Sequence, residues 1–203
     1  NPDVRRIFAF RWAGTSRKVD KGMAQHVCAK LVLTLREEAD RHHAAAQAMD
    51  EARHHLAYRR LINAMGKEVE DIDAGTEMMF DALLSMDDPL ELIATEQFFL
   101  ESFAMSIFES LHREATHPLL RRILELITRD ESRHMGFGVL YLAEWMHRQP
   151  LDRRIAFARP WMGQILGSIM DRPGPIMLAR VVQRLNEAGV VDAQALAPQL
   201  LRE

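Results

Sequence analysis

Two pentapeptides of nearly identical sequence, DEARH and DESRH, start 80 residues apart and carry the residue types best suited to chemistry. The first includes Glu51 and His54, and the second includes Glu131 and His134. Residues three apart in an α-helix lie on one face about one turn apart, so each pair can hold one metal ion. Carboxylate and imidazole ligands suit iron or manganese. One such pair is common on helices, but two copies predict a site for two metal ions.

The alternative interpretation is that both motifs are solvated helix turns. It does not explain why apolar residues lie close to both copies, namely Ala48, Leu56, Ile127 and Phe137. A metal site is therefore the interpretation we favour.

A dinuclear site in a four-helix bundle needs one further carboxylate from each of the other two helices. The candidates before the second motif are Glu96 and Glu101. Hairpin symmetry about a turn near Thr116 places Glu101 level with Glu131, whereas Glu96 lies on a more apolar stripe. The residues alone leave both candidates open.

The helices that must position these residues are predicted by apolar residues at helical spacing from about Asp20 onward. Asp88 and Pro89 are typical of a helix N-cap and first helical position, and Pro118 opens the next helix in the same way. The predicted elements are long helices at about 20–35, 41–65, 88–114 and 118–149, with a short segment at 78–84. The sequence thus predicts an all-α fold, with two antiparallel hairpins at about 20–148 and further helices in an extension at 151–203.

Composition limits the other possibilities. A length of 203 residues with 48% hydrophobic content suits one domain, and a net charge of −3 argues against binding to nucleic acid or to a membrane. Basic residues such as Arg133 alternate with acids, which is typical of a solvated helix face. The single cysteine, Cys28, excludes an internal disulfide and favours the cytoplasm. No apolar run is long enough to span a bilayer, and the start lacks a secretory signal.

Together these features resemble the ferritin-like superfamily, in the branch that contains the class I ribonucleotide reductase small subunit, the ligand-binding oxidases and p-aminobenzoate N-oxygenase. The resemblance covers about residues 20–145 and implies a ferritin-like four-helix bundle. In these families the third-helix ligand lies in an apolar stretch resembling ATEQFFLESFA, which implies Glu96, 35 residues before Glu131. Most relatives have a first-helix glutamate where this chain has Lys21. Asp20, 31 residues before Glu51, resembles the reductase ligand, so the resemblance implies Asp20.

The resemblance implies further roles around the metals. Asp50 and Asp130 would each accept a hydrogen bond from the histidine of the opposite motif. Tyr58 occupies a place resembling that of the radical-forming tyrosine of the reductase, and its alternative is an ordinary core tyrosine. Gly136 and Gly138 would line a cavity or allow close helix packing. The remaining histidines are interpreted as surface or capping residues: His42, His43, His55, His112, His117 and His147.

The predicted function is a di-iron oxygenase or oxidase, with a manganese–iron pair as the other option. It would use O₂ and an external electron donor to oxidise a small, largely apolar substrate by hydroxylation, N-oxygenation or desaturation. Aromatic and apolar residues of the third helix could form a cavity wall, and the alternative for most of them is ordinary core; they are Phe98, Phe99, Phe103, Met105 and Phe108. Ile127 replaces an extra histidine of the N-oxygenases. The alternatives are a radical-generating subunit, an iron-binding or ferroxidase protein, and a metal-free helical protein. A homodimer is expected.

Overall fold

The computed structural model describes residues 23–64, 74–165 and 167, and all secondary structure in this part of the chain is helical. The described residues make six helices, one of which is a continuous run of three consecutive elements, 89–114. Their bounds are α2 (Met23–Thr34), α3 (Glu38–Ala64), α4 (Ala74–Ser85), α5 (Pro89–Ile93), η2 (Ala94–Leu100), α6 (Glu101–Glu114), α7 (Pro118–Arg148) and α8 (Leu151–Gln164). The prediction of an all-α fold is confirmed for these residues.

Helix boundaries follow the capping residues of the sequence. The side chain of Asp88 accepts a hydrogen bond from the Leu90 N–H at 2.8 Å, and Pro89 is the first helical residue. Pro118 opens α7 in the same way, and Pro150 separates α7 from α8. The second long helix begins at Glu38, before the predicted start, because the expected turn is confined to residues 35–37.

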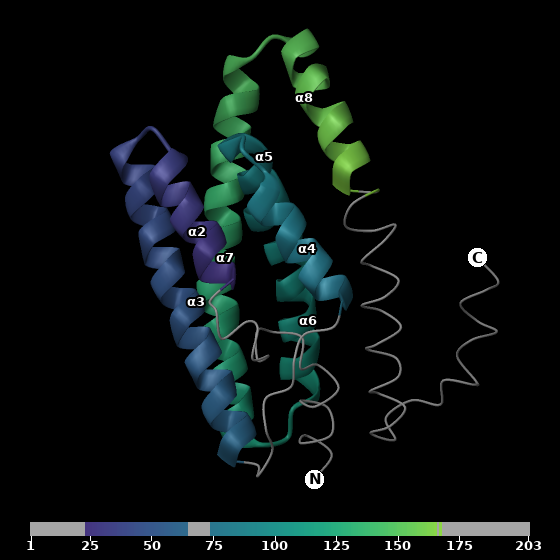
Figure 1. Cartoon of the computed structure of the whole chain (residues 1–203). Helices are drawn as coiled ribbons and strands as arrows, with labels where there is room; N and C mark the ends of the chain where they lie inside the picture. Colours follow the sequence, from purple (N-terminus) through teal and green to yellow (C-terminus); the bar gives the residue numbers. More distant parts are fainter. Residues whose placement is uncertain (1–22, 65–73, 166, 168–203) are drawn as a thin grey trace, which may run out of the picture.

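Two pairs of helices that are neighbours in sequence also pack together in space (Figure 1). The helix α2 packs along α3, and α6 packs along α7. The two pairs meet where α3 contacts α7, while α4 and α5 contact α2. This arrangement brings the middle of α3, which carries the first motif, against the middle of α7, which carries the second.

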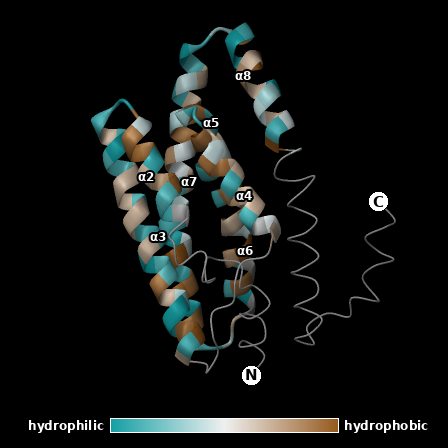
Figure 2. Ribbon diagram, viewed as in Figure 1, coloured by the Kyte–Doolittle hydropathy of each residue, from teal (hydrophilic) through white to brown (hydrophobic). Residues whose placement is uncertain are grey.

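Two apolar clusters lie on either side of the motifs. Along α3, Ala44 belongs to one cluster and Tyr58 to the other, and the first motif lies between them. Along α7 the order is reversed, because Leu124 belongs to the second cluster and Phe137 packs on the first. A polar layer is thus enclosed between two apolar layers. Hydrophilic and hydrophobic residues both occur along α3 (Figure 2).

The helix α8 packs on η2, a π-helical segment whose turn is wider than that of an α-helix and which we call the wide turn. The indole Nε1–H of Trp161 donates to Thr95 Oγ1 at 3.0 Å, and Ile165 is buried with Met79 in a third apolar cluster. Residues 166 and 168–203 of the predicted C-terminal extension lie outside the described residues. Among the described helices, none has the length and apolar character needed to cross a membrane.

Candidate metal centre

The two motifs face each other because each lies on the buried stripe of its helix. The buried residues of α3 are spaced three or four apart, and they include Gln47, Asp50 and His54. On α7 the buried stripe includes Glu131 and His134. This spacing is the helical period that the sequence predicted, with polar side chains at positions that would otherwise carry apolar ones.

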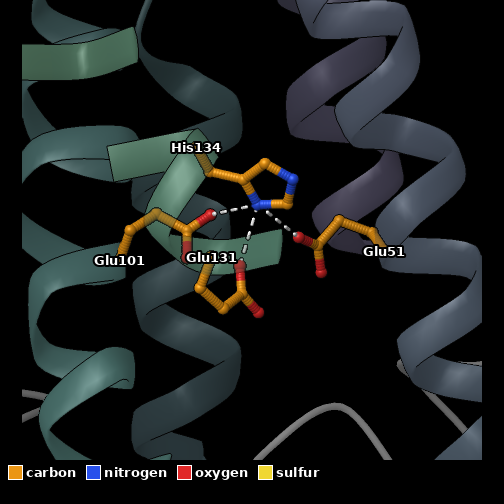
Figure 3. Close-up of side chains that lie close together, drawn as sticks. All are labelled: Glu51, Glu101, Glu131 and His134. Carbon is orange, nitrogen blue, oxygen red and sulfur yellow. Dashed lines mark hydrogen bonds and ion pairs between the residues drawn. The ribbon is translucent and has the colours of Figure 1, made fainter. Parts of the chain in front are cut away.

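Four side chains from three helices converge on one point (Figure 3). One atom each of Glu51, Glu101, Glu131 and His134 lies within 4.8 Å of the other three. The Nδ1 atom of His134 is 2.8 Å from Glu131 Oε2, 3.4 Å from Glu101 Oε1 and 3.6 Å from Glu51 Oε1. A buried group of three carboxylates and an imidazole can hold a metal ion.

The histidine of the first motif adjoins the same group. Its Nδ1 atom lies 3.2 Å from Glu131 Oε1 and 4.0 Å from Glu51 Oε2. The two oxygens of Glu131 therefore face two different imidazoles, those of His54 and His134. A carboxylate placed in this way can bridge two metal ions, one on each histidine.

Each motif's aspartate contacts the histidine of the other motif. The Nε2 atom of His54 is 3.2 Å from Asp130 Oδ2, and Nε2 of His134 is 3.0 Å from Asp50 Oδ2. These are the crossed contacts that the family resemblance implies. A carboxylate at Nε2 fixes the tautomer and leaves Nδ1 directed at the acids.

Two arginines complete this network, and sequence reasoning missed both. Arg53 Nη2 donates to Asp50 at 2.6 Å and to Asp130 at 2.7 Å. Arg133 Nη2 donates to Asp50 at 3.1 Å and to Asp130 at 2.7 Å. Arg133 is exposed, as expected of a solvated helix face, and its guanidinium also pairs with Asp50 across the layer. The arginine in both DEARH and DESRH was the signal that could have revealed the network.

The third long helix brings both of its candidate glutamates into the polar layer. Gln47 Nε2 donates to Glu96 Oε1 at 3.3 Å and to Glu101 Oε1 at 3.0 Å. The side-chain oxygen of Gln47, Oε1, in turn accepts a hydrogen bond from Gln97 Nε2 at 2.7 Å. Neither glutamine was recognised from the sequence, because an isolated polar residue in a helical stripe gives no distinctive pattern.

Glycine explains how closely α7 approaches this helix. A Cβ atom at Gly138 would lie 2.9 Å from Gln97 Cβ and 3.0 Å from its carbonyl carbon, so only glycine fits. A Cβ atom at Gly136 would have no neighbour within 4 Å. Of the two interpretations given to these glycines, close packing describes Gly138.

Tyr58 and His43 lie at opposite ends of the polar layer. The Tyr58 ring stacks near Phe108, and its buried hydroxyl has no hydrogen-bond partner. Burial raises the pKa of Tyr58 far above its usual value. His43, interpreted from sequence as a surface residue, is half-buried and stacks on Phe137 with ring centroids 4.1 Å apart. Its ring also meets His134 edge-on.

The aromatic residues of the third helix do not form a single wall. Phe108 packs with Tyr58, and Phe99 packs beside Ile165. Phe98 and Phe103 are 40% and 51% exposed. Their helix presents them to different sides, and Phe108 and Phe99 belong to the packing of two separate apolar clusters.

The electrostatics of the polar layer separate the acids into two groups. Burial raises the pKa values of Glu51, Glu96 and Glu101. Burial also opposes ionisation of Glu131, but hydrogen bonds from His134 and His54 outweigh it and lower its pKa. In the same way burial lowers the pKa of His134, and its contacts with Glu101 and Glu131 reverse this and raise it to about 11.

The chain was compared with protein-family models, curated proteins and solved structures. None of them matches. The described residues form an all-helical protein with a buried glutamate–histidine cluster that could hold a metal ion. The expected first-helix ligand, Asp20, lies outside the described residues.

Proposed function

We propose that this chain is a ferritin-like four-helix protein that binds two iron ions and uses them to reduce O₂ while oxidising a small organic substrate. The observation that carries the proposal is the pair of facing motifs, in which Glu131 lies between His54 and His134. The α2–α3 and α6–α7 pairs would be the two hairpins of the bundle.

The residues fit such a pair of metals. The donors are carboxylate oxygens and imidazole nitrogens, which suit iron, and a manganese–iron pair accepts the same ligands. Glu51, His54, Glu131 and His134 would be ligands from the motifs, and Glu96 a ligand from the third helix. The family resemblance implies Asp20, in the first helix, as a sixth ligand. The Oε2 atom of Glu96 is buried without a hydrogen-bond partner. An ionised carboxylate oxygen in that position needs a cation or a donor, which a metal ion supplies.

The side chains around the metals have separate tasks in this proposal. Two ferrous ions, when bound there, would supply two electrons to O₂. Asp130 and Asp50 hold the imidazoles of His54 and His134 in one orientation, and Arg53 with Arg133 holds the two aspartates. The apolar clusters on either side of the polar layer keep water away from the reaction, which also favours a largely apolar substrate.

Tyr58 supports a second candidate, a radical-generating protein similar to the reductase small subunit. Its hydroxyl is buried and unpartnered, and Glu131 and Glu51 both contribute to the raised pKa of its phenol. A buried tyrosine at one end of the polar layer could donate an electron and a proton. An electron paramagnetic resonance signal that forms with O₂ in the parent and is absent in Tyr58→Phe would favour this candidate over substrate oxidation.

The remaining roles follow from the same chemistry. Turnover would need an external electron donor to return the metals to the ferrous state. A homodimer would cover apolar side chains that the first hairpin exposes, which are Leu33, Met49 and Leu56. Iron binding without an organic substrate would use the same site, and product analysis separates it from an oxygenase.

The test is oxygen uptake by protein loaded with ferrous ion under anaerobic conditions. We expect rapid uptake of one O₂ per pair of ferrous ions, because each ion gives one electron. In Glu131→Gln the uptake should slow to the rate of free ferrous ion. Glu125→Gln, an exposed position on the same helix, is the matched control and should behave as the parent. A parent no faster than free ferrous ion would contradict the proposal.

A further inference from the structure

The helix that carries Glu96 and Glu101 is widened where these residues lie. The Glu101 N–H donates to the Glu96 carbonyl, five residues back, as in a π-helix. In a regular α-helix residues five apart point about 140° away from each other. A hydrogen bond that spans five residues places them about one turn apart instead, on one side of the helix.

Burial and contacts agree with this local geometry. Glu96 is 8% exposed and Glu101 is 6% exposed. The amide of Gln47 on α3 reaches both, at 3.3 Å and 3.0 Å. All residues from Leu92 to Gln97 are buried, so the part of the wide turn that carries Glu96 is enclosed by other parts of the chain, whereas Phe98 is exposed.

The unsatisfied oxygen of Glu96 is the independent sign of a ligand. Its Oε1 atom contacts Gln47, but Oε2 is buried and has no hydrogen-bond partner. Leaving a carboxylate oxygen in that state is unfavourable unless a proton or a metal ion occupies the position. Glu101 already lies 3.4 Å from the Nδ1 atom of His134, at the point where the other acids converge.

The charges of the polar layer also favour Glu96 and Glu101 as ligands of two metal ions. The polar layer contains four glutamates, Glu51, Glu96, Glu101 and Glu131, which carry four negative charges when ionised. Two divalent metal ions carry four positive charges and require neutral histidines. These described residues therefore form a neutral site with two metals, without a further acid from the first helix.

We propose that the wide turn lets one helix supply two metal ligands, Glu96 and Glu101, so that Glu101 takes the place expected for Asp20. This inference rests on the proposed dinuclear iron centre. The ligand set is then Glu51, His54, Glu96, Glu101, Glu131 and His134, drawn from three helices.

The experiment is anaerobic titration of the metal-free chain with ferrous ion, followed by calorimetry and by metal counting with plasma mass spectrometry. The variants are Glu96→Gln, Glu101→Gln and Asp20→Asn, with Glu109→Gln as an exposed control on the same helix. We expect about a tenfold or greater rise in Kd, with loss of at least one ion, for both Glu96→Gln and Glu101→Gln. Asp20→Asn and Glu109→Gln should bind as the parent does.

The outcomes separate this inference from the proposed function. A parent that binds two ions, with unchanged binding in Glu96→Gln or in Glu101→Gln, would overturn the two-ligand turn and leave the dinuclear centre intact. Loss of an ion in Asp20→Asn would overturn the substitution of Glu101 for Asp20. A parent that binds no iron would contradict the proposed function itself. Thermal unfolding of the metal-free variants checks folding, and Glu101→Asp, expected to lose affinity as well, replaces any Glu101→Gln that does not fold.

Discussion

Glu51 and Glu131 hold the same position in the two motifs, but their surroundings differ. Glu131 lies 2.8 Å from Nδ1 of His134 and 3.2 Å from Nδ1 of His54, whereas the corresponding distances of Glu51 are 3.6 Å and 4.0 Å. Burial raises the pKa of Glu51, and the two imidazoles lower that of Glu131. The repeated sequence thus builds two similar scaffolds, and the contacts across the layer decide how each glutamate ionises.

This difference predicts that the second motif contributes more to metal affinity than the first. Glu131→Gln removes the carboxylate between both histidines, so we expect both ions to be lost. The loss of affinity should exceed the roughly 10–100-fold typical of residues that only orient a ligand. Glu51→Gln should lose less metal affinity than Glu131→Gln does. Calorimetric titration with ferrous ion measures both, and equal losses would show that the closer contacts of Glu131 have no energetic weight.

The aspartates should behave alike, because their contacts are symmetric. Asp50→Asn and Asp130→Asn each remove a charged partner of one histidine and weaken the pairs with Arg53 and Arg133. We expect metal affinity to fall about 10–100-fold in each variant. If one variant binds as the parent does, the crossed contact of that aspartate does not orient a ligand.

The two glycines of α7 offer a test of packing. At Gly138 an alanine Cβ would clash with Gln97, so Gly138→Ala should lower the free energy of unfolding by about 1–3 kcal/mol. At Gly136 the added methyl group meets nothing within 4 Å, and Gly136→Ala should raise it by about 0.4–1 kcal/mol. Urea unfolding of the metal-free protein measures both. A harmless Gly138→Ala would contradict the close approach of α7 to η2.

The pH dependence of stability separates Glu51 from Glu131 in the metal-free protein. A raised pKa means that the folded state holds the proton more tightly than the unfolded state does. The contribution of Glu51 to the free energy of unfolding is therefore full below its ordinary pKa of 4.5, and it is lost as the pH rises through the folded pKa. Glu96, Glu101 and His134 act in the same direction. The lowered pKa of Glu131 gives a contribution that is present above 4.5 and lost only in acid.

We therefore expect the melting temperature of the metal-free chain to fall from about pH 5 to pH 9. Glu51→Gln should flatten this fall, and Glu131→Gln should not. Ferrous ion under anaerobic conditions should reverse the trend, because metal binds the deprotonated acids. A melting temperature that rises with pH in the metal-free parent would contradict the assignment of protons to Glu51, Glu96 and Glu101.

The sequence predicts the helices and the motif positions well, since both depend on local rules. Asp88 with Pro89, and Pro118, mark helix starts through capping, and the repeat identifies Glu51 and Glu131 directly. The wide turn is different. A regular helical period places Glu96 and Glu101 on different faces, so the two are alternatives in the sequence. The structure brings both inward because η2 inserts one residue into that turn.

Residues that act through neighbours were also hidden from sequence reasoning. Gln47 has meaning only beside Glu96 and Glu101, which are about 50 residues away in the chain. Arg133 has the appearance of a surface residue until Asp50 is brought next to it by the packing of α3 on α7. Such contacts depend on tertiary structure, which periodicity and composition do not specify.

The most direct test of the central claim is the metal content of freshly purified protein, before and after loading with ferrous ion, measured by plasma mass spectrometry. The account predicts about two metal ions per chain in the parent and in the control Glu125→Gln, and a sharp fall in Glu131→Gln. A folded parent that contains no metal and cannot be loaded would contradict it.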